Sequence, residues 1–371
     1  MYSGNTPSRF NKEHFNGNVN WISSGELKEH YIYSSKEQIS EEAAKNLKLL
    51  PIGTFVIAIY GLEAEGVRGT GSIIKEPSTI SQACMSFISK GAIENEFLYS
   101  WYKKHGNVIG IRYAQGTKQQ NLSYDILESF KIAYPCTKEQ KKLNKFVTLL
   151  DERIFTQTKI IEDLKKLKSA ISKHLFMRKD LLETTICLSD IATLKNGYAF
   201  QSSKYNALGK WKIITIANVS GERYINDKDC NRIINLPNDI QDHQVLKEGD
   251  VLISLTGNVG RVSLCNVGSY LLNQRVGLLQ VAKNVEQEFL YQVLSSHNFE
   301  NSMIACSQGA AQMNIGKGDV ESYVLPYSSN ANNIHLVAKI LHLYDERIVN
   351  ELRKLTLLTM QKQYLLVNMF I

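Results

Sequence analysis

One hexapeptide occurs twice in this chain, and this repetition limits the possible folds more than any other feature. LLDERI (149–154) returns as LYDERI (343–348). Longer matches follow in the same order at offsets of 192 to 196: LPIGTFVIAIYG with LKEGDVLISLTG, ENEFLYSWY with EQEFLYQVL, and GTKQQNLSYDILESFKIAYP with GAAQMNIGKGDVESYVLPYS. Matches in one fixed order over about 130 residues indicate a tandem duplication of almost the whole chain.

Each copy has two parts. The first part contains β-branched and aromatic runs punctuated by Gly and Asn, such as TFVIAIYG, KIITIANV, DVLISLTG and RVSLCNV, which predict short strands. Within it, NEFLYSWYKKH and QEFLYQVLSSH predict helices. The second part predicts one long helix in each copy, over about 139–176 and 332–370, with Pro135 and Pro326 just ahead of them.

Apolar residues in both long helices alternate at spacings of four and three, the pattern of a coiled coil. Polar residues interrupt it at matching steps, Gln157 with Glu351 and Lys168 with Lys362. Such residues restrict register and partner, although inheritance from one ancestral helix explains the match equally well. We expect an α+β fold with approximate two-fold symmetry, in which the helices pair antiparallel. The apolar seam positions are Leu143, Val147, Leu150, Ile154, Ile161, Leu164, Ile171, Leu175, Val337, Leu341, Tyr344, Ile348, Leu355, Leu358, Leu365 and Met369.

The repeat predicts four consecutive segments. They are module 1 (1–136), spacer helix 1 (137–181), module 2 (182–330) and spacer helix 2 (331–371). Module 2 opens with LSDIATLK (188–195), which has no counterpart before Ser3 and Gly4 in module 1. We therefore expect module 1 to lack the first strand of module 2 and to leave an unpaired sheet edge.

The composition is ordinary for a globular protein, with 43% hydrophobic and 21% charged residues. No apolar run approaches the roughly 18 residues needed to span a bilayer, and MYSGNTPSRFNKEHF lacks a signal-peptide core. The six cysteines form no C-x-x-C pair, so the sequence suggests neither a disulfide framework nor a zinc site. These features predict a cytoplasmic protein with reduced thiols.

Most of the net charge of +7 lies in residues 137–180, which hold twelve Lys/Arg and six Asp/Glu. A basic excess favours a polyanionic partner such as nucleic acid. A solvated helix face explains this segment equally well.

Motifs for nucleotide chemistry and catalysis do not occur in the sequence. AAQMNIGKG (310–318) has Ala311 and Gly318 where a Walker A motif needs Gly and Ser/Thr. There is no G-x-G-x-x-G after a strand and no H-E-x-x-H, and no two prolines are adjacent, as the signature of amino-methyltransferases requires. The eight histidines lack companions at metal-ligand spacing. The sequence therefore predicts no catalytic, cofactor or metal site in this chain.

Two similar modules joined by a helical spacer suit a reader of an extended polymer, and duplex DNA is the natural candidate. Dimeric readers in general contact half-sites about 34–36 Å apart. Because the modules differ in sequence, we expect the half-sites to differ.

The whole pattern resembles the specificity subunit of type I restriction-modification enzymes, over essentially all 371 residues. The resemblance rests on the order of L-x-x-I-A-x-x-x-N-G-x-x-F (188–200), EGDVLISLTGNVGRV, LNQRVGLLQV, GAAQMNIGKGDVESYVLP and the two DERI helices. It implies two target recognition domains, each reading one part of a bipartite DNA site. It also implies an antiparallel coiled coil that fixes the gap and docks two modification subunits.

Those partner subunits, as the resemblance implies, bind S-adenosylmethionine and methylate adenine at N6. A restriction subunit adds ATP- and Mg-dependent translocation and cleavage. This chain would itself be a non-catalytic specificity subunit without a cofactor.

Base-reading candidates follow from side-chain chemistry, since Arg or Lys suits guanine and Asn or Gln suits adenine. Arg68 and Arg261, which do not match between the copies, favour specificity, whereas Lys118 and Lys317 favour phosphate contacts. The Gln and Asn positions shared by both copies are equally well explained as architectural. The candidates are Arg68, Gln82, Lys118, Gln119, Asn121, Asn258, Arg261, Gln274, Arg275, Gln312, Asn314 and Lys317.

Three alternatives remain open. A recognition subunit of a type IIB-like restriction enzyme would have the same sequence features, and genomic neighbours would separate the two. A coiled-coil adaptor that binds proteins would show no steep salt dependence of DNA binding. An enzyme with an unfamiliar site would be active without partners.

Overall fold

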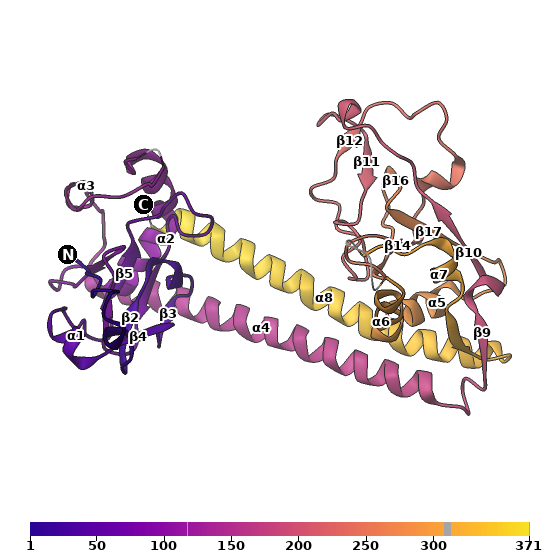
Figure 1. Ribbon diagram of the computed structural model, residues 1–371, viewed down its shortest axis with the longest axis horizontal. Helices are drawn as coiled ribbons and strands as arrows, with labels where there is room; N and C mark the ends of the chain where they lie inside the picture. The colour runs from indigo at the N-terminus through magenta and orange to yellow at the C-terminus, as the bar shows by residue number, and fades with distance from the viewer. Residues whose placement is uncertain (117, 308–312, 371) are drawn as a thin grey trace. The chain divides into compact units, whose positions relative to one another are not determined.

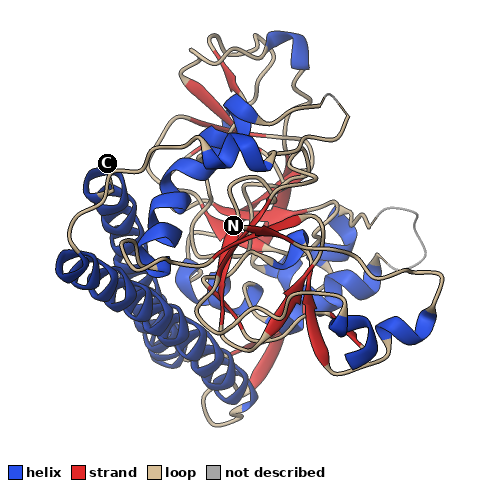
Figure 2. Cartoon of the chain, turned by 90° about the vertical axis from the view of Figure 1, so that its left-hand side faces the viewer, coloured by secondary structure: helices blue, strands red, loops and turns tan. Residues whose placement is uncertain are grey.

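The fold contains two long helices and two α/β modules. Figure 1 colours them by residue number from the N-terminus to the C-terminus. The computed structural model describes residues 1–116, 118–307 and 313–370. The long helices are α4 (Thr137–Met177) and α8 (Ala331–Met369), and they confirm the two helices that the apolar spacing predicts. Figure 2 shows that the strands and most of the remaining helices are short and are joined by long stretches of loop.

The chain forms two compact units, and the division falls inside both long helices. Unit 1 comprises Met1–Thr156 and Leu355–Ile371, and unit 2 comprises Gln157–Lys354. Each unit therefore contains one module together with one part of α4 and one part of α8. The four segments predicted from the sequence have their boundaries at the ends of the long helices, since a boundary through the middle of a helix leaves no mark in composition.

In unit 1, a five-stranded sheet has the order β1-β8-β5-β6-β3, and a three-stranded sheet has the order β4-β2-β7. Helix α2 packs on strands β5 and β6 of the larger sheet. The elements are β1 (Tyr2–Ser3), η1 (Lys12–Phe15), β2 (Val19–Ile22), η2 (Ser24–Glu26), β3 (Tyr31–Ile32), β4 (Glu37–Ile39), α1 (Glu41–Lys45), β5 (Phe55–Ala58), β6 (Gly71–Ile74), β7 (Ser78–Ile80), β8 (Cys84–Phe87), α2 (Asn95–Tyr113) and α3 (Tyr124–Glu128).

In unit 2, two four-stranded sheets have the orders β10-β17-β14-β15 and β12-β11-β16-β13, and a two-stranded sheet joins β18 to β9. The elements are β9 (Thr184–Cys187), η3 (Leu188–Asp190), β10 (Ala192–Asn196), η4 (Ser202–Lys204), β11 (Trp211–Ile214), β12 (Arg232–Ile233), η5 (Asp242–Gln244), β13 (Val245–Leu246), β14 (Val251–Ser254), β15 (Val262–Leu264), β16 (Tyr270–Leu272), β17 (Val276–Val281), α5 (Gln287–Leu294), α6 (His297–Cys306), α7 (Lys317–Glu321) and β18 (Val324–Tyr327).

The two modules share their central pattern, as the repeat predicts. Strands β5 and β14 each lie between two antiparallel neighbours, and all four residues of each are buried. The turn before the next strand contains Gly69 in unit 1 and Gly260 in unit 2, with φ of 71° and 77°. A Cβ there would lie 2.7 Å from the Asn107 backbone or 2.8 Å from the Met303 side chain. Glycine at this turn therefore lets the helix pack closely on the sheet.

Contacts between the long helices within unit 2 establish their direction. Gln157 of α4 bonds to Glu351 of α8 at 2.7 Å, and Lys168, eleven residues further along α4, bonds to Asp345 at 2.6 Å. The residue number of the partner in α8 falls as the residue number in α4 rises, so the two helices run antiparallel there. All sixteen seam positions are buried or half-buried.

The first strand of module 1 differs from the expectation drawn from sequence. It is shortened rather than missing: β1 has two residues and pairs with β8, whereas β10 has five and pairs with β17. A larger difference lies elsewhere. Strand β18 pairs with β9 in unit 2, but residues 131–134, which align with β18, form no strand in unit 1.

Candidate nucleic-acid interface

Three separate loops of unit 2 are held together by backbone hydrogen bonds. The amide of Leu255 donates to the carbonyl of Arg275 at 3.0 Å, and the amide of Ile315 donates to Leu255 at 2.9 Å. The amide of Gly257 donates to Met313 at 3.0 Å. These bonds unite residues 255–258, 273–275 and 313–315 into one surface, here called loop surface 2.

Four predicted base-reading residues are exposed on loop surface 2: Asn258, Gln274, Arg275 and Asn314. The sequence separates them by up to 56 positions, but the sheet brings their loops to one edge. Their side chains combine the amide and guanidinium groups that discriminate base edges. Gln312, another predicted reader, lies outside the described residues.

Unit 1 contains an equivalent loop surface 1, built from residues 59–62, 82–83 and 120–122. The amide of Ile59 donates to Ala83 at 2.9 Å, and the amide of Leu122 donates to Ile59 at 2.8 Å. Gln82 is exposed there, and the predicted Lys118 and Gln119 are exposed on the adjoining loop. Both modules therefore present polar side chains from the same three connections.

The asparagine shared by the two copies has the same backbone role in both. Asn121 forms a β-bridge with Tyr60, and Asn314 forms one with Thr256. Asn121 is half-buried, whereas Asn314 is exposed. The backbone position is thus common to the repeat, while the two side chains differ in their access to a ligand.

The remaining predicted cations have partners within their own unit. Arg68 is half-buried, and its Nη2 donates to Gln120 Oε1 at 2.5 Å. Arg261 Nε lies 3.5 Å from a carboxylate oxygen of Glu300. Lys317 Nζ lies 3.7 Å from Glu321 within α7. Of the cationic candidates, Arg275 is the one that lies on loop surface 2, and it is exposed there.

A buried ion network, which the sequence reasoning missed, joins module 2 to the long helices. Arg223 donates to both carboxylate oxygens of Glu288, at 2.9 and 2.6 Å, and to Oδ2 of Asp345 at 3.1 Å. The other oxygen of Asp345 accepts from Lys168 of α4 at 2.6 Å. Only 7% of the Arg223 and Asp345 side chains is exposed. One α8 carboxylate therefore bonds to the module and to the opposite helix at once.

Unit 1 repeats this arrangement with a histidine in place of the arginine. His30 Nε2 lies 2.8 Å from Glu96, and Nδ1 lies 3.8 Å from Asp151, which also pairs with Lys362. The imidazole stacks between the rings of Tyr31 and Tyr99, with centroids 4.0 Å away on each side. Burial, and then the nearby charge of Glu96, raises the pKa of Tyr31 to about 12.

The two networks explain the repeated DERI peptide. Its aspartate is Asp151 in one copy and Asp345 in the other, and each pairs with the seam lysine of the opposite helix. The aspartates and the lysines both repeat at an offset of 194. That shared offset is the signal in the sequence from which these ion pairs could have been found. Assigning each aspartate to its lysine also requires the antiparallel register of the two helices, which the sequence does not give.

The network in module 2 predicts an acid sensitivity that depends on Glu288. Burial raises its pKa, but hydrogen bonds from Arg223 and Gln292 outweigh burial and hold the pKa below its ordinary value of 4.5. The stability that Glu288 contributes is therefore complete above about pH 4.5 and is lost as the pH falls through the folded-state value. We expect the difference in unfolding free energy between wild type and Glu288→Gln to shrink between pH 7 and pH 3. A constant difference over this range, measured by denaturant titration, would contradict this.

Within the described residues, no cluster of three or more His, Cys, Asp or Glu side chains is placed to hold a metal ion. Among the helices of the described residues, none has the length and apolar character of a membrane span.

Comparisons with known proteins agree with this architecture. The model for the type I restriction modification DNA specificity domain matches residues 2–166 and again 183–359. The MjaIX specificity subunit of Methanocaldococcus jannaschii is 29% identical over 180 residues, which cover 47% of this chain and 40% of that protein. The EcoR124I/EcoR124II specificity subunit of Escherichia coli is 30% identical over 187 residues, covering 49% and 45%. The matches thus span less than half the length of these curated relatives.

Two solved structures share the fold. The type I restriction-modification S subunit of M. genitalium superposes with a TM-score of 0.59 at 16% identity, covering 100% of this chain and 93% of that one. A chain from a type I restriction-modification system, studied for complex assembly and conformational transition, gives a TM-score of 0.58 at 17% identity, with coverage of 94% and 90%.

Proposed function

The chain belongs to the family of type I restriction-modification DNA specificity domains, carrying two tandem copies, and on this premise we propose that it is the non-catalytic specificity subunit of such a system. Each module reads one half of a bipartite DNA site through its loop surface. The long helices fix the gap between the halves and dock two adenine-methyltransferase subunits, and restriction subunits join this assembly in the cytoplasm. S-adenosylmethionine, ATP and Mg belong to those partners.

The observation that carries this proposal is the duplication of the loop surfaces. Two copies of one three-loop edge present different side chains, Gln82 in unit 1 and Asn258, Gln274 and Arg275 in unit 2. A repeated scaffold with unlike exposed amides and guanidinium groups fits a reader of two unlike half-sites.

The test is the distribution of N6-methyladenine in genomic DNA, with the gene present and deleted, in cells that contain the modification partner. We expect a motif of two unlike halves and a fixed gap that disappears on deletion. If every methylated motif persists without the gene, the proposed role is wrong.

Within module 2, we expect Arg275→Ala to weaken binding to the cognate site by about 1–3 kcal/mol, the usual contribution of a bidentate base contact. The matched control is Lys283→Ala. Arg275 and Lys283 are both exposed and flank the two ends of β17, but Lys283 is not on loop surface 2. Fluorescence anisotropy with cognate and scrambled duplexes measures both. Equal losses for the two variants, or equal losses on both duplexes, would remove Arg275 from the set of base readers.

A further inference from the structure

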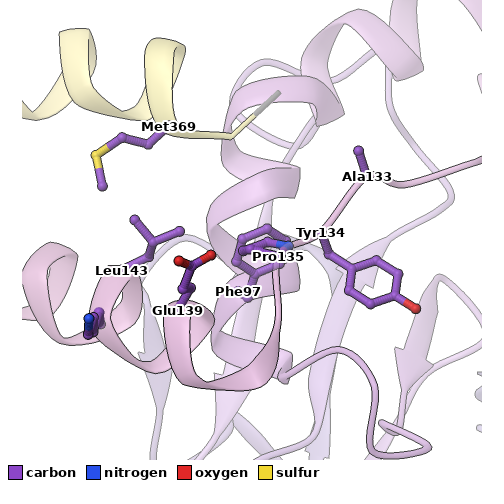
Figure 3. A pocket seen from close by; sticks show the side chains of 8 residues that line it. Phe97, Ala133, Tyr134, Pro135, Glu139, Leu143 and Met369 are labelled. Atoms are coloured by element: carbon purple, nitrogen blue, oxygen red, sulfur yellow. The ribbon is translucent and has the colours of Figure 1, made fainter.

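Unit 1 contains an apolar pocket of about 490 Å³ where α2 and the two long helices meet. Figure 3 shows Phe97 of α2, Leu143 of α4 and Met369 of α8 facing the same space, with the chain segment of Tyr134 and Pro135 along its side. Glu139 and Lys142 contribute to its lining. The pocket is therefore apolar inside and has one charge of each sign among its lining side chains.

The internal repeat identifies the counterparts of the pocket-lining residues in unit 2. The residues aligned with Phe97, Tyr134, Leu143 and Met369 are Phe289, Tyr327, Val337 and Leu175. These residues form one apolar cluster with Leu182, which is 1% exposed, and with Leu181 and Ile186 packed against it. The segment 181–186 thus adds aliphatic side chains to the same cluster that contains the counterparts of the residues lining the pocket in unit 1.

The same segment also supplies a strand. In β9, Ile186 pairs with Leu325 and Thr184 pairs with Tyr327, antiparallel to β18. Leu325 is fully buried beneath this pairing, whereas the aligned Ile132 of unit 1 is half-buried. Tyr134 is 48% exposed. No described residue of unit 1 pairs as a strand with residues 131–134, so this edge and the neighbouring pocket are both open.

We propose that unit 1 binds an extended segment of a partner polypeptide, which adds antiparallel to residues 131–134 and places an aliphatic side chain in the apolar pocket. Such a segment carries large aliphatic residues four positions apart, as Leu182 and Ile186 are in unit 2. Main-chain hydrogen bonds to the open edge provide affinity, and the pocket selects the side chain, which is the usual division in recognition by strand addition. This binding site does not depend on what the loop surfaces bind.

The probe is a fluorescent peptide with the sequence of residues 179–188, KDLLETTICL, with serine replacing the cysteine, titrated against the full chain. We expect saturable binding that is about tenfold or more tighter than for the same peptide with Leu182→Asp and Ile186→Asp, because burying one leucine is worth roughly this factor. Absent binding, or equal binding of the two peptides, would overturn the proposal without bearing on DNA recognition.

A pair of proline substitutions in the chain tests the strand addition. Ala133 aligns with Pro326, a proline that β18 tolerates while paired with β9. We therefore expect Ala133→Pro to retain peptide binding and Ile132→Pro, which removes a neighbouring backbone donor, to lose it. Loss in both variants, or in neither, would exclude this pairing register. If the peptide instead dissociates a dimer of the chain in sedimentation, the occupant is a second copy and the proposed partner source is wrong.

Discussion

Replacing Arg223 by glutamine is expected to lower the unfolding free energy of unit 2 by about 3–5 kcal/mol, the usual cost of removing one partner from a buried ion pair. The guanidinium makes three hydrogen bonds to Glu288 and Asp345, and burial leaves little water to replace it. Without it, the two carboxylates lie near each other and keep Lys168, Gln292 and His342 as nearby partners. The repulsion between these two carboxylates lowers the unfolding free energy further, in addition to the loss of the hydrogen bonds.

Hydrogen exchange read by mass spectrometry measures this effect, because it reports on the two units separately. Protection in β14 and β17 should fall in Arg223→Gln while protection in β5 and β8 of unit 1 is unchanged. His30→Gln is the matched comparison: its Glu96 and Asp151 partners are 33% and 28% exposed, so we expect a loss of about 1 kcal/mol or less. Equal losses in the two variants would show that the two networks do not differ in strength.

Inserting one heptad into both long helices is expected to lengthen the gap of the recognised DNA site by about three base pairs. Seven helical residues add about 10.5 Å, and each base pair occupies about 3.4 Å. Equivalent insertions after Gln157 and Glu351 preserve the seam spacing, since a heptad restores the same face of a coiled coil. Methylome mapping should then find both half-sites unchanged and only the gap altered.

Exchanging residues 1–135 for another module of this family is the complementary change. We expect it to replace one half-site and to leave the other half and the gap intact, because each loop surface is built within a single unit. If either the heptad insertion or the module exchange changes the entire methylated motif, modular reading by independent loop surfaces is refuted.

The repeat made much of the fold predictable. Apolar spacing located α4 and α8 to within two residues, and the β-branched runs located β5, β11, β14 and β15. Such patterns are local, and they record which face of an element is buried. The β9–β18 pair was missed because its strands are four residues long, come from opposite ends of module 2 and include a proline. Neither strand carries the alternation that marks a half-buried strand.

The candidate interface was predictable in its residue types but not in its assembly. The glycine-flanked Asn and Gln were chosen by chemistry, and their convergence on one edge depends on hydrogen bonds between loops far apart in sequence. Arg223 was missed because its partners Glu288 and Asp345 lie 65 and 122 positions away. Arg68 and Arg261 gave no sequence signal that internal partners would engage them.

The aspartate of the DERI peptide has a consequence for how such chains can diversify. One of its oxygens pairs with the lysine of the opposite helix and the other lies next to a basic side chain of its module, His30 in one copy and Arg223 in the other. Both long helices therefore present the same aspartate, and each module meets it with a basic side chain and a nearby glutamate, His30 with Glu96 and Arg223 with Glu288. Given the proposed function, we expect that a whole module with such a pair of side chains can replace another without redesign of the helices.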